Sequence, residues 1–226
     1  MINYCENICI IASLTYCNSG VYTKDERFEQ VKNTIKSIRE KIPNSLVVFI
    51  DISNFNADEK KYLEDNCDIF INPCDNVELI GKVSDRKSYG EKSYIQFALD
   101  LLNDNTGTYS FNKYPKLKNI FKVGARYFLN DQFDFNCYDN MYDIIKVVPR
   151  EIYSDACYSS LFKISKQNIP SFIESLKIYD YGLSTNQYDM ERMMYKHVNR
   201  LPAQNKYIEK LGITCLTALC RNESYE

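Results

Sequence analysis

The sequence predicts an α/β protein: one domain with a mostly parallel, Rossmann-like sheet, helices on both faces, and an irregular α+β C-terminal third. Apolar runs alternate with segments of helical periodicity through residue 131, and this alternation is typical of a parallel sheet with right-handed crossovers. The runs are continuously apolar, as in strands that are covered on both faces. No linker or internal repeat interrupts the 226 residues, so we expect a single domain over residues 1–226.

The N-terminal half shows the regular alternation. Apolar and β-branched runs indicate the strands, while capping boxes and a three-to-four-residue apolar spacing indicate the helices. The predicted elements are a strand at 7–15, a helix from about 24 to 42, a strand at 45–51, a short helix capped by Asn56, a strand at 67–72, a helix opened by residues 88–91, and a strand at 119–131. Because ligands of such sheets bind beyond the carboxyl ends of the strands, we expect the site there.

The C-terminal third is less regular. Residues 143–148 and 157–164 alternate like half-exposed, antiparallel strands. One helix is predicted near Pro170 and another over about 188–198, where methionines and His197 form the buried stripe. A short apolar segment at 208–219 ends the pattern.

The predicted strand at 119–131 carries two cations in an otherwise apolar run. Side chains alternate between the faces of a strand, so Lys122, Gly124, Arg126 and Phe128 are expected on one face. Two buried positive charges need anionic partners. Internal salt bridges would supply them, and so would a phosphorylated ligand, for which Gly124 leaves space. The strand alone does not choose between these two interpretations.

Composition narrows the classes of function. The net charge is −2 and there is no basic run, which argues against nucleic-acid binding. Nine dispersed cysteines without a C-x-x-C pair, and a single histidine, indicate reduced cysteines in the core rather than zinc sites or disulfides. No signal peptide or membrane-length apolar run is seen, so we expect a cytoplasmic protein. The 19 tyrosines suit carbohydrate stacking, and a biased genome composition explains them equally well.

Several common catalytic motifs are absent from the sequence. It contains no G-x-G-x-x-G, no P-loop and no G-x-S-x-G elbow. A single histidine leaves little scope for a serine or cysteine triad. A carboxylate at the end of the second strand and cations on the fourth strand remain.

Three segments resemble one known family. They are Ser13-Leu-Thr15, the helix from Arg27 through Arg39, and above all the strand segment from Lys122 through Tyr127. Together they resemble GT-A-type glycosyltransferases, which use nucleotide-diphospho-sugars, and the likeness is strongest to a group from large DNA viruses and some bacteria. The resemblance covers roughly residues 7–220. Ala125 departs from the K-x-S-G-R-Y pattern of that group.

The resemblance implies a hexosyltransferase-like enzyme that moves a sugar from a UDP- or GDP-sugar to a hydroxyl of a glycan or protein. Residues 1–131 would then form the nucleotide-sugar half and residues 132–226 the acceptor half. The implied donor-binding residues are Ser13, Thr15, Arg27, Asp51, Lys92, Lys122, Arg126 and Tyr127. Of these, Lys92, Lys122 and Arg126 are expected to supply positive charge to the departing diphosphate.

The metal motif of the family is missing. No Asp-x-Asp pair ends the fourth strand, so Mn²⁺ or Mg²⁺ would have only Asn130, Asp131 and Asp134 nearby, with Asp131 the candidate ligand. The catalytic residues expected are Glu191 as the base, with Asp155 and Asp131 behind it, and Arg126 for charge stabilisation.

Plainer roles compete with several of these assignments. Asp51 would serve equally to cap a loop, and Arg27 to form a solvated pair with Asp25 or Glu26. Glu191 would serve to complement the helix dipole, and His197 is expected to be a packed helix residue. Two other functions stay open. One is a non-catalytic, transferase-like module that binds a nucleotide or glycan or has a structural role, and the other is a nucleotidyltransferase, which needs paired acidic metal ligands.

Overall fold

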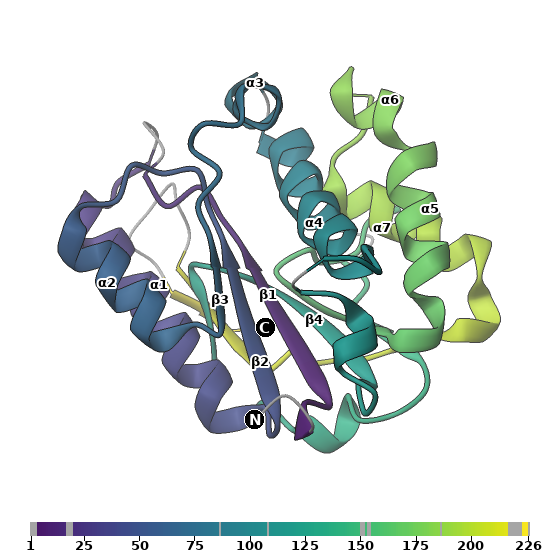
Figure 1. Cartoon of the computed structure of the whole chain (residues 1–226). Coiled ribbons are helices and arrows are strands. Elements are labelled where there is room, and N and C mark those ends of the chain that lie inside the picture. Colours follow the sequence, from purple (N-terminus) through teal and green to yellow (C-terminus); the bar gives the residue numbers. More distant parts are fainter. Residues whose placement is uncertain are drawn as a thin grey trace.

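A seven-stranded sheet forms the centre of the molecule, and a second, three-stranded sheet lies beside it (Figure 1). The computed structural model describes residues 4–16, 20–85, 87–107, 109–149, 152, 155–185, 187–216 and 223–225, without the side chains of 84, 85, 87, 88 and 223–225. In spatial order the large sheet contains β3 (Ile69–Ile71), β2 (Ser45–Ile50), β1 (Asn7–Ala12), β4 (Asn119–Gly124), β7 (Leu161–Ser165), β6 (Asp143–Ile145) and β8 (Asn205–Tyr207). The small sheet contains β10 (Glu223–Tyr225), β9 (Ile213–Leu216) and β5 (Tyr127–Leu129).

The helices connect these strands. They are α1 (Lys24–Lys41), α2 (Ala57–Asn66), α3 (Val77–Asp85), α4 (Lys87–Asn103), α5 (Ile169–Ile178), α6 (Asp180–Ser184) and α7 (Met190–Arg200). Short 3-10 turns are η2 (Phe111–Lys113), η3 (Phe135–Cys137), η4 (Lys166–Asn168) and η5 (Pro202–Gln204). No helix in the described ranges is both long and apolar enough to cross a membrane.

The strand pairing confirms the predicted α/β class. β1 pairs in parallel with β2 and with β4, and β2 pairs in parallel with β3. β7 runs antiparallel to β4 and β6 antiparallel to β7, as the alternation in the C-terminal third predicted. The parallel strands therefore share one carboxyl edge, where Ala12 lies opposite both Ile50 and Gly124.

Two helical layers cover the sheet (Figure 1). Ile8 and Ile10 of β1 pack into a core with α4, α5 and α7. Cys9 and Ile11 of the same strand pack into a second core with α1 and α2. This division follows directly from side-chain alternation along a strand that is covered on both faces.

The capping signals of the first two helices are realised in the structure. The Thr23 hydroxyl accepts from the backbone N–H of Glu26, whose carboxylate accepts from the backbone N–H of Thr23, so α1 begins at Lys24. Asn56 and Glu59 form the same reciprocal pair before α2. The predicted box at 88–91 includes Ser88, whose side chain is not described, and α4 begins at Lys87. Helix α3 lies between the predicted strand at 67–72 and the predicted helix opened by residues 88–91, where no element was predicted.

The buried polar residues of the C-terminal third include the single histidine. His197 is fully buried in α7, and its Nδ1 is 2.8 Å from the hydroxyl oxygen of Ser175. The prediction of a packed helix residue is confirmed. Free cysteines 5, 9, 67, 157 and 215 are buried, whereas Cys74 and Cys137 are exposed, and Cys17 and Cys220 lie outside the described residues.

The predicted strand at 119–131 is wrong as a single element. β4 ends at Gly124, residues 125 and 126 turn, and β5 continues in the small sheet, paired with β9. A Cβ on Gly124 would lie 2.4 Å from the ring of Tyr127. The missing side chain thus allows the chain to fold back with Tyr127 against Gly124. Gly124 therefore gives its space to Tyr127 rather than to a ligand, and Lys122 and Arg126 do not share one strand face.

Candidate functional site at the carboxyl edge

Asp51 ties together the loops that follow the first three strands. Its buried carboxylate accepts from the backbone N–H and the hydroxyl of Thr15, at 2.7 and 2.6 Å, and from the backbone N–H of Ser53 at 2.6 Å. The side-chain amide of Asn72 donates to the backbone carbonyl of Asp51, and Ser13 donates its N–H to Ile50. Thr15 and Asp51 thus satisfy each other, and the loop-capping role foreseen for Asp51 is present.

The pH dependence of stability provides a test of the buried environment of Asp51. Burial outweighs the hydrogen bonds and raises the pKa of Asp51 from its ordinary value of 3.8 to about 6. A carboxyl group whose pKa is higher in the folded than in the unfolded protein stabilises the fold at pH values below its pKa in the unfolded protein. This stabilisation is lost as the pH rises through its pKa in the folded protein. Relative to Asp51→Asn, the wild-type free energy of unfolding should therefore fall by as much as about 3 kcal/mol between pH 4 and 7.

Urea unfolding of both proteins at half-unit pH steps measures this difference. Using the difference removes the contribution of the other carboxyl groups, which titrate in both proteins. A difference in unfolding free energy that stays constant between pH 4 and 7 would contradict the raised pKa of Asp51.

Lys122 joins β4 to the helical layer through a buried network. Its ammonium forms an ion pair with Glu91 of α4 and donates to the backbone carbonyl of Ser159 at 2.6 Å. The hydroxyl of Ser159 in turn donates to Glu191 of α7 at 2.8 Å. Burial, and secondarily the negative charge of Glu91, raise the pKa of Glu191. A carboxylate of raised pKa beside an internal ion pair is an arrangement suited to proton transfer.

Arg126 lies in the turn directly after β4, at the same edge of the sheet. Its guanidinium carbon is 5.9 Å from the ring centroid of Tyr127. Its Nη1 is buried and, within the described part of the chain, has no hydrogen-bond partner. A buried donor without an acceptor costs about 1–3 kcal/mol, and more when it is charged. An anionic oxygen placed against Nη1 would remove that cost.

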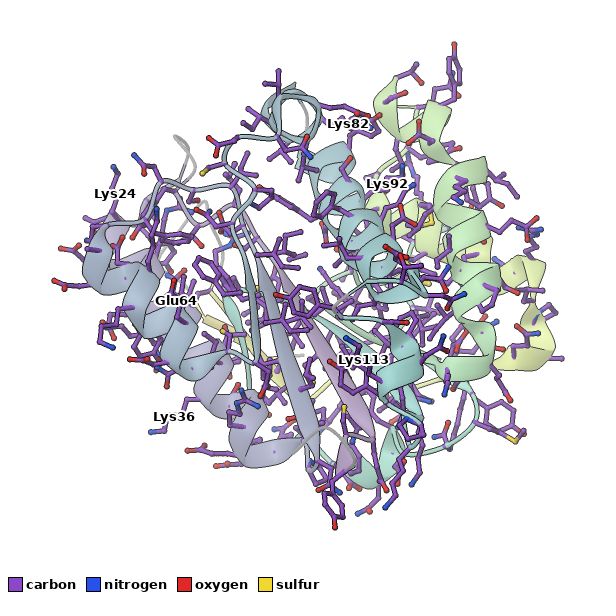
Figure 2. All side chains as sticks on the ribbon, viewed as in Figure 1. Lys24, Lys36, Glu64, Lys82, Lys92 and Lys113 are labelled. Atoms are coloured by element: carbon purple, nitrogen blue, oxygen red, sulfur yellow. The ribbon has the colours of Figure 1, made fainter. Side chains whose placement is uncertain are left out.

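Lys92 does not offer an unpaired charge. Although it is almost fully buried in α4, its ammonium forms an ion pair with Asp180 of α6. Figure 2 shows Lys92 on the side of α4 that faces α6. Of the three cations expected to meet a diphosphate, Lys92 and Lys122 are thus neutralised by the chain's own carboxylates. Internal salt bridges, the alternative left open by the sequence, account for these two.

Arg27 lies in the first turn of α1, whose start is at the carboxyl edge. It is buried, and its Nε donates to the backbone carbonyl of Tyr22 at 3.3 Å. It makes a further interaction besides this one. The interpretation of Arg27 as a solvated surface residue is therefore wrong.

Asp131 is not brought together with the other predicted residues. Its side chain is fully exposed and pairs with Lys41, the last residue of α1, at 3.2 Å. Two residues later, the Pro43 carbonyl accepts from Asn7 at the start of β1, which places this end of α1 at the amino edge of the sheet. Because β5 turns away beside α1, Asp131 lies at the edge opposite Arg126, and we do not retain it as a base or a metal ligand.

The described part of the carboxyl edge offers no set of side chains that fits a divalent metal ion. Among the described residues, no three His, Cys, Asp or Glu side chains gather as metal ligands. Asp134 accepts from the backbone N–H of Asn136 in η3, and the side-chain oxygen of Asn130 accepts from the backbone N–H of Gln132, so both oxygens are engaged in local turns. The carboxylates of Glu91 and Glu191 already hold an ammonium and a hydroxyl, and that of Asp51 accepts hydrogen bonds from Thr15 and Ser53.

Sequence reasoning missed two members of this network. Glu91 was read only as the last residue of a capping box, and Ser159 only as part of a predicted strand. The available signal was the position of Glu91 near the start of a helix that begins at the expected edge. The partner of Lys122 was not visible, because Glu91 is 31 residues away in sequence.

Several solved structures are similar to this chain. GlyE, a glycosyltransferase of Streptococcus pneumoniae TIGR4, superposes with a TM-score of 0.52 at 7% identity, over 92% of this chain and 46% of GlyE. The chain therefore spans less than half of GlyE. Core-mannan synthase A of Aspergillus fumigatus, in its Mn/GDP form, gives a TM-score of 0.48 at 13% identity, over 94% and 74% of the two chains. A glycosyltransferase involved in glycosylation of the PBCV-1 major capsid gives 0.47 at 10% identity, over 90% and 81%.

At the level of sequence, the chain matches no family model and no curated protein. The structural likeness to GlyE, by contrast, confirms the predicted GT-A-like architecture.

Proposed function

We propose that this protein, whose fold is that of the GT-A-type nucleotide-diphospho-sugar transferases, transfers a sugar from a UDP- or GDP-sugar to a hydroxyl of a glycan or protein. One observation carries the proposal: Arg126 presents a buried guanidinium nitrogen without a partner in the described chain, directly beyond the central strand. Ligands of parallel sheets bind at this edge. A guanidinium is suited to phosphate because its N–H groups match the phosphate oxygens.

In this proposal Arg126 contacts the diphosphate and stabilises the charge that develops as the sugar leaves. Lys122 holds Glu91 and the Ser159 carbonyl in place, and Ser159 orients Glu191. Glu191 then accepts the proton of the attacking hydroxyl. Ser13, Thr15, Arg27 and Tyr127 remain proposed contacts of the nucleotide side, and Asp51 fixes the loop that carries Thr15.

Calorimetry with UDP and GDP, each with EDTA or with Mn²⁺, tests donor binding. Release of nucleotide from UDP-glucose and GDP-mannose then tests turnover, with water as the acceptor. We expect one nucleotide to bind and the corresponding sugar nucleotide to be hydrolysed. Absence of binding under all four conditions would overturn the proposal.

Replacing Glu191 with Gln should reduce donor hydrolysis by about 100-fold or more, since general bases contribute roughly 10²–10⁴ to rates. Nucleotide affinity should stay within about twofold, because the variant keeps the shape of the side chain. Glu64→Gln, on the exposed outer side of α2, is the matched control (Figure 2). Equal hydrolysis by the Glu191 and Glu64 variants would remove Glu191 from the mechanism.

A non-catalytic nucleotide- or glycan-binding module is the second candidate. The pairs Lys122–Glu91 and Lys92–Asp180 favour it, because they leave less positive charge for a departing diphosphate. Nucleotide binding without release of nucleotide from either sugar nucleotide, with Mn²⁺ or with EDTA, would select this alternative.

A further inference from the structure

A groove runs along the outer face of α7, on the side of the helix away from the core. Its volume is about 680 Å³, within the range typical of small-molecule sites. Arg192, Tyr195, Lys196 and Arg200 of α7 line it, together with Tyr188 just before the helix and Tyr179. The other face of α7, including the fully buried Met193 and Met194, packs into the core, so the groove is built on a fixed helix.

Aromatic rings form one part of the lining. Tyr179 and Tyr188 meet edge to face, with centroids 5.9 Å apart, and both are partly buried. A Cβ on Gly182 would lie 2.0 Å from the Tyr188 ring, so the absence of a side chain at Gly182 permits the position of Tyr188. The tyrosines are therefore fixed aromatic rings that carry polar hydroxyls, a combination suited to binding sugars.

Positively charged side chains form the other part of the groove lining. The exposed Lys196 places its ammonium 5.5 Å from the Tyr188 centroid, and no carboxylate of the described chain forms a salt bridge with it. Arg200 pairs with Glu174 at 3.0 Å, which leaves its remaining donors for a ligand. Asp155 is the acidic residue of the lining. In a chain of net charge −2, this local excess of cations selects for negative charge.

We propose that this groove binds an anionic carbohydrate chain, with sugar rings stacked on Tyr179 and Tyr188 and acidic groups held by Lys196 and Arg200. The tyrosines account for the sugar and the cations for its carboxylate, sulfate or phosphate groups. Single-stranded nucleic acid also combines stacking with charge, but it requires a longer cationic track than this groove and this net charge provide.

The location suggests what the bound chain is for. Glu191 lies in the first turn of α7, between Tyr188 and Arg192 in sequence. A chain lying along the groove would thus end near the proposed base, and the groove would hold the acceptor. This assignment as acceptor rests on the proposed function, whereas binding of the anionic chain does not.

Isothermal calorimetry with three probes and no nucleotide tests the groove: tetragalacturonate, neutral maltotetraose and the oligonucleotide dT8. We expect tetragalacturonate to bind at least tenfold more tightly than the other two. Lys196→Glu and Tyr188→Ala should each weaken it at least tenfold, and Gly182→Ala should weaken it by displacing the Tyr188 ring. Lys36→Glu, at an exposed position of α1 on the far side of the molecule, should leave affinity unchanged (Figure 2).

Three results would overturn the proposal: tetragalacturonate binding no tighter than maltotetraose, unchanged affinity in the Lys196 and Tyr188 variants, or tighter binding of dT8. The two proposals can be rejected independently. If nucleotide binds but the anionic glycan does not, only the proposal for the groove is wrong. If the glycan binds but no nucleotide does, only the proposed transferase function is wrong.

Discussion

Arg126→Ala is expected to lower donor hydrolysis by roughly 100- to 1,000-fold, the effect typical of removing one preorganised donor from a developing charge. The reason is specific to this side chain, because Lys92 and Lys122 are already paired with Asp180 and Glu91. The same variant should not lower the melting temperature, since Nη1 forms no hydrogen bond within the described chain. Reduced activity with unchanged or raised stability is the combined signature.

Kinetics of nucleotide release and thermal unfolding of the same preparations measure the two effects. Arg126→Lys keeps the charge but loses the planar fork, so it should recover only part of the activity. Lys36→Ala is the surface control (Figure 2). If Arg126→Ala released nucleotide at the wild-type rate, the diphosphate would have to be held elsewhere, and the proposed site would be wrong.

Gly212→Ala should produce the largest loss of stability, roughly 3 kcal/mol or more. Gly212 has φ of 72°, a conformation that an L side chain adopts only at a cost. A Cβ there would also lie 2.3 Å from the Cα of Phe133, which is backbone and cannot rotate away. For a chain of this size the melting temperature should fall by about 6–12 °C.

Gly81→Ala provides a matched control for this prediction. Gly81 is exposed within α3, and a Cβ there meets nothing within 4 Å. Replacing a helical glycine by alanine should raise stability by about 0.5–1 kcal/mol. The same substitution should therefore have opposite signs at the two sites. A similar, small change at both would show that the segment at Gly212 relaxes around the new methyl group.

Local signals predicted the elements of the N-terminal half well. The reciprocal caps of Thr23 with Glu26 and of Asn56 with Glu59 involve residues three apart, so they are readable from sequence and appear in the structure. The buried strands β1 and β2 were equally visible, because two-sided burial requires a continuous apolar run. The break after Gly124 was not predicted, since apolar residues continue on both sides of the turn.

The sequence by itself determined the α/β class, the parallel sheet, and the edge where ligands of such a sheet bind. Tertiary structure alone decided which charges are satisfied there. Lys122 is paired with Glu91, Lys92 with Asp180, and Asp131 with Lys41 at the opposite edge, while Nη1 of Arg126 has no partner in the described chain. The physical reason is distance along the chain. Periodicity and capping act over a few residues, whereas these ion pairs join residues 31, 88 and 90 positions apart, which only packing brings together.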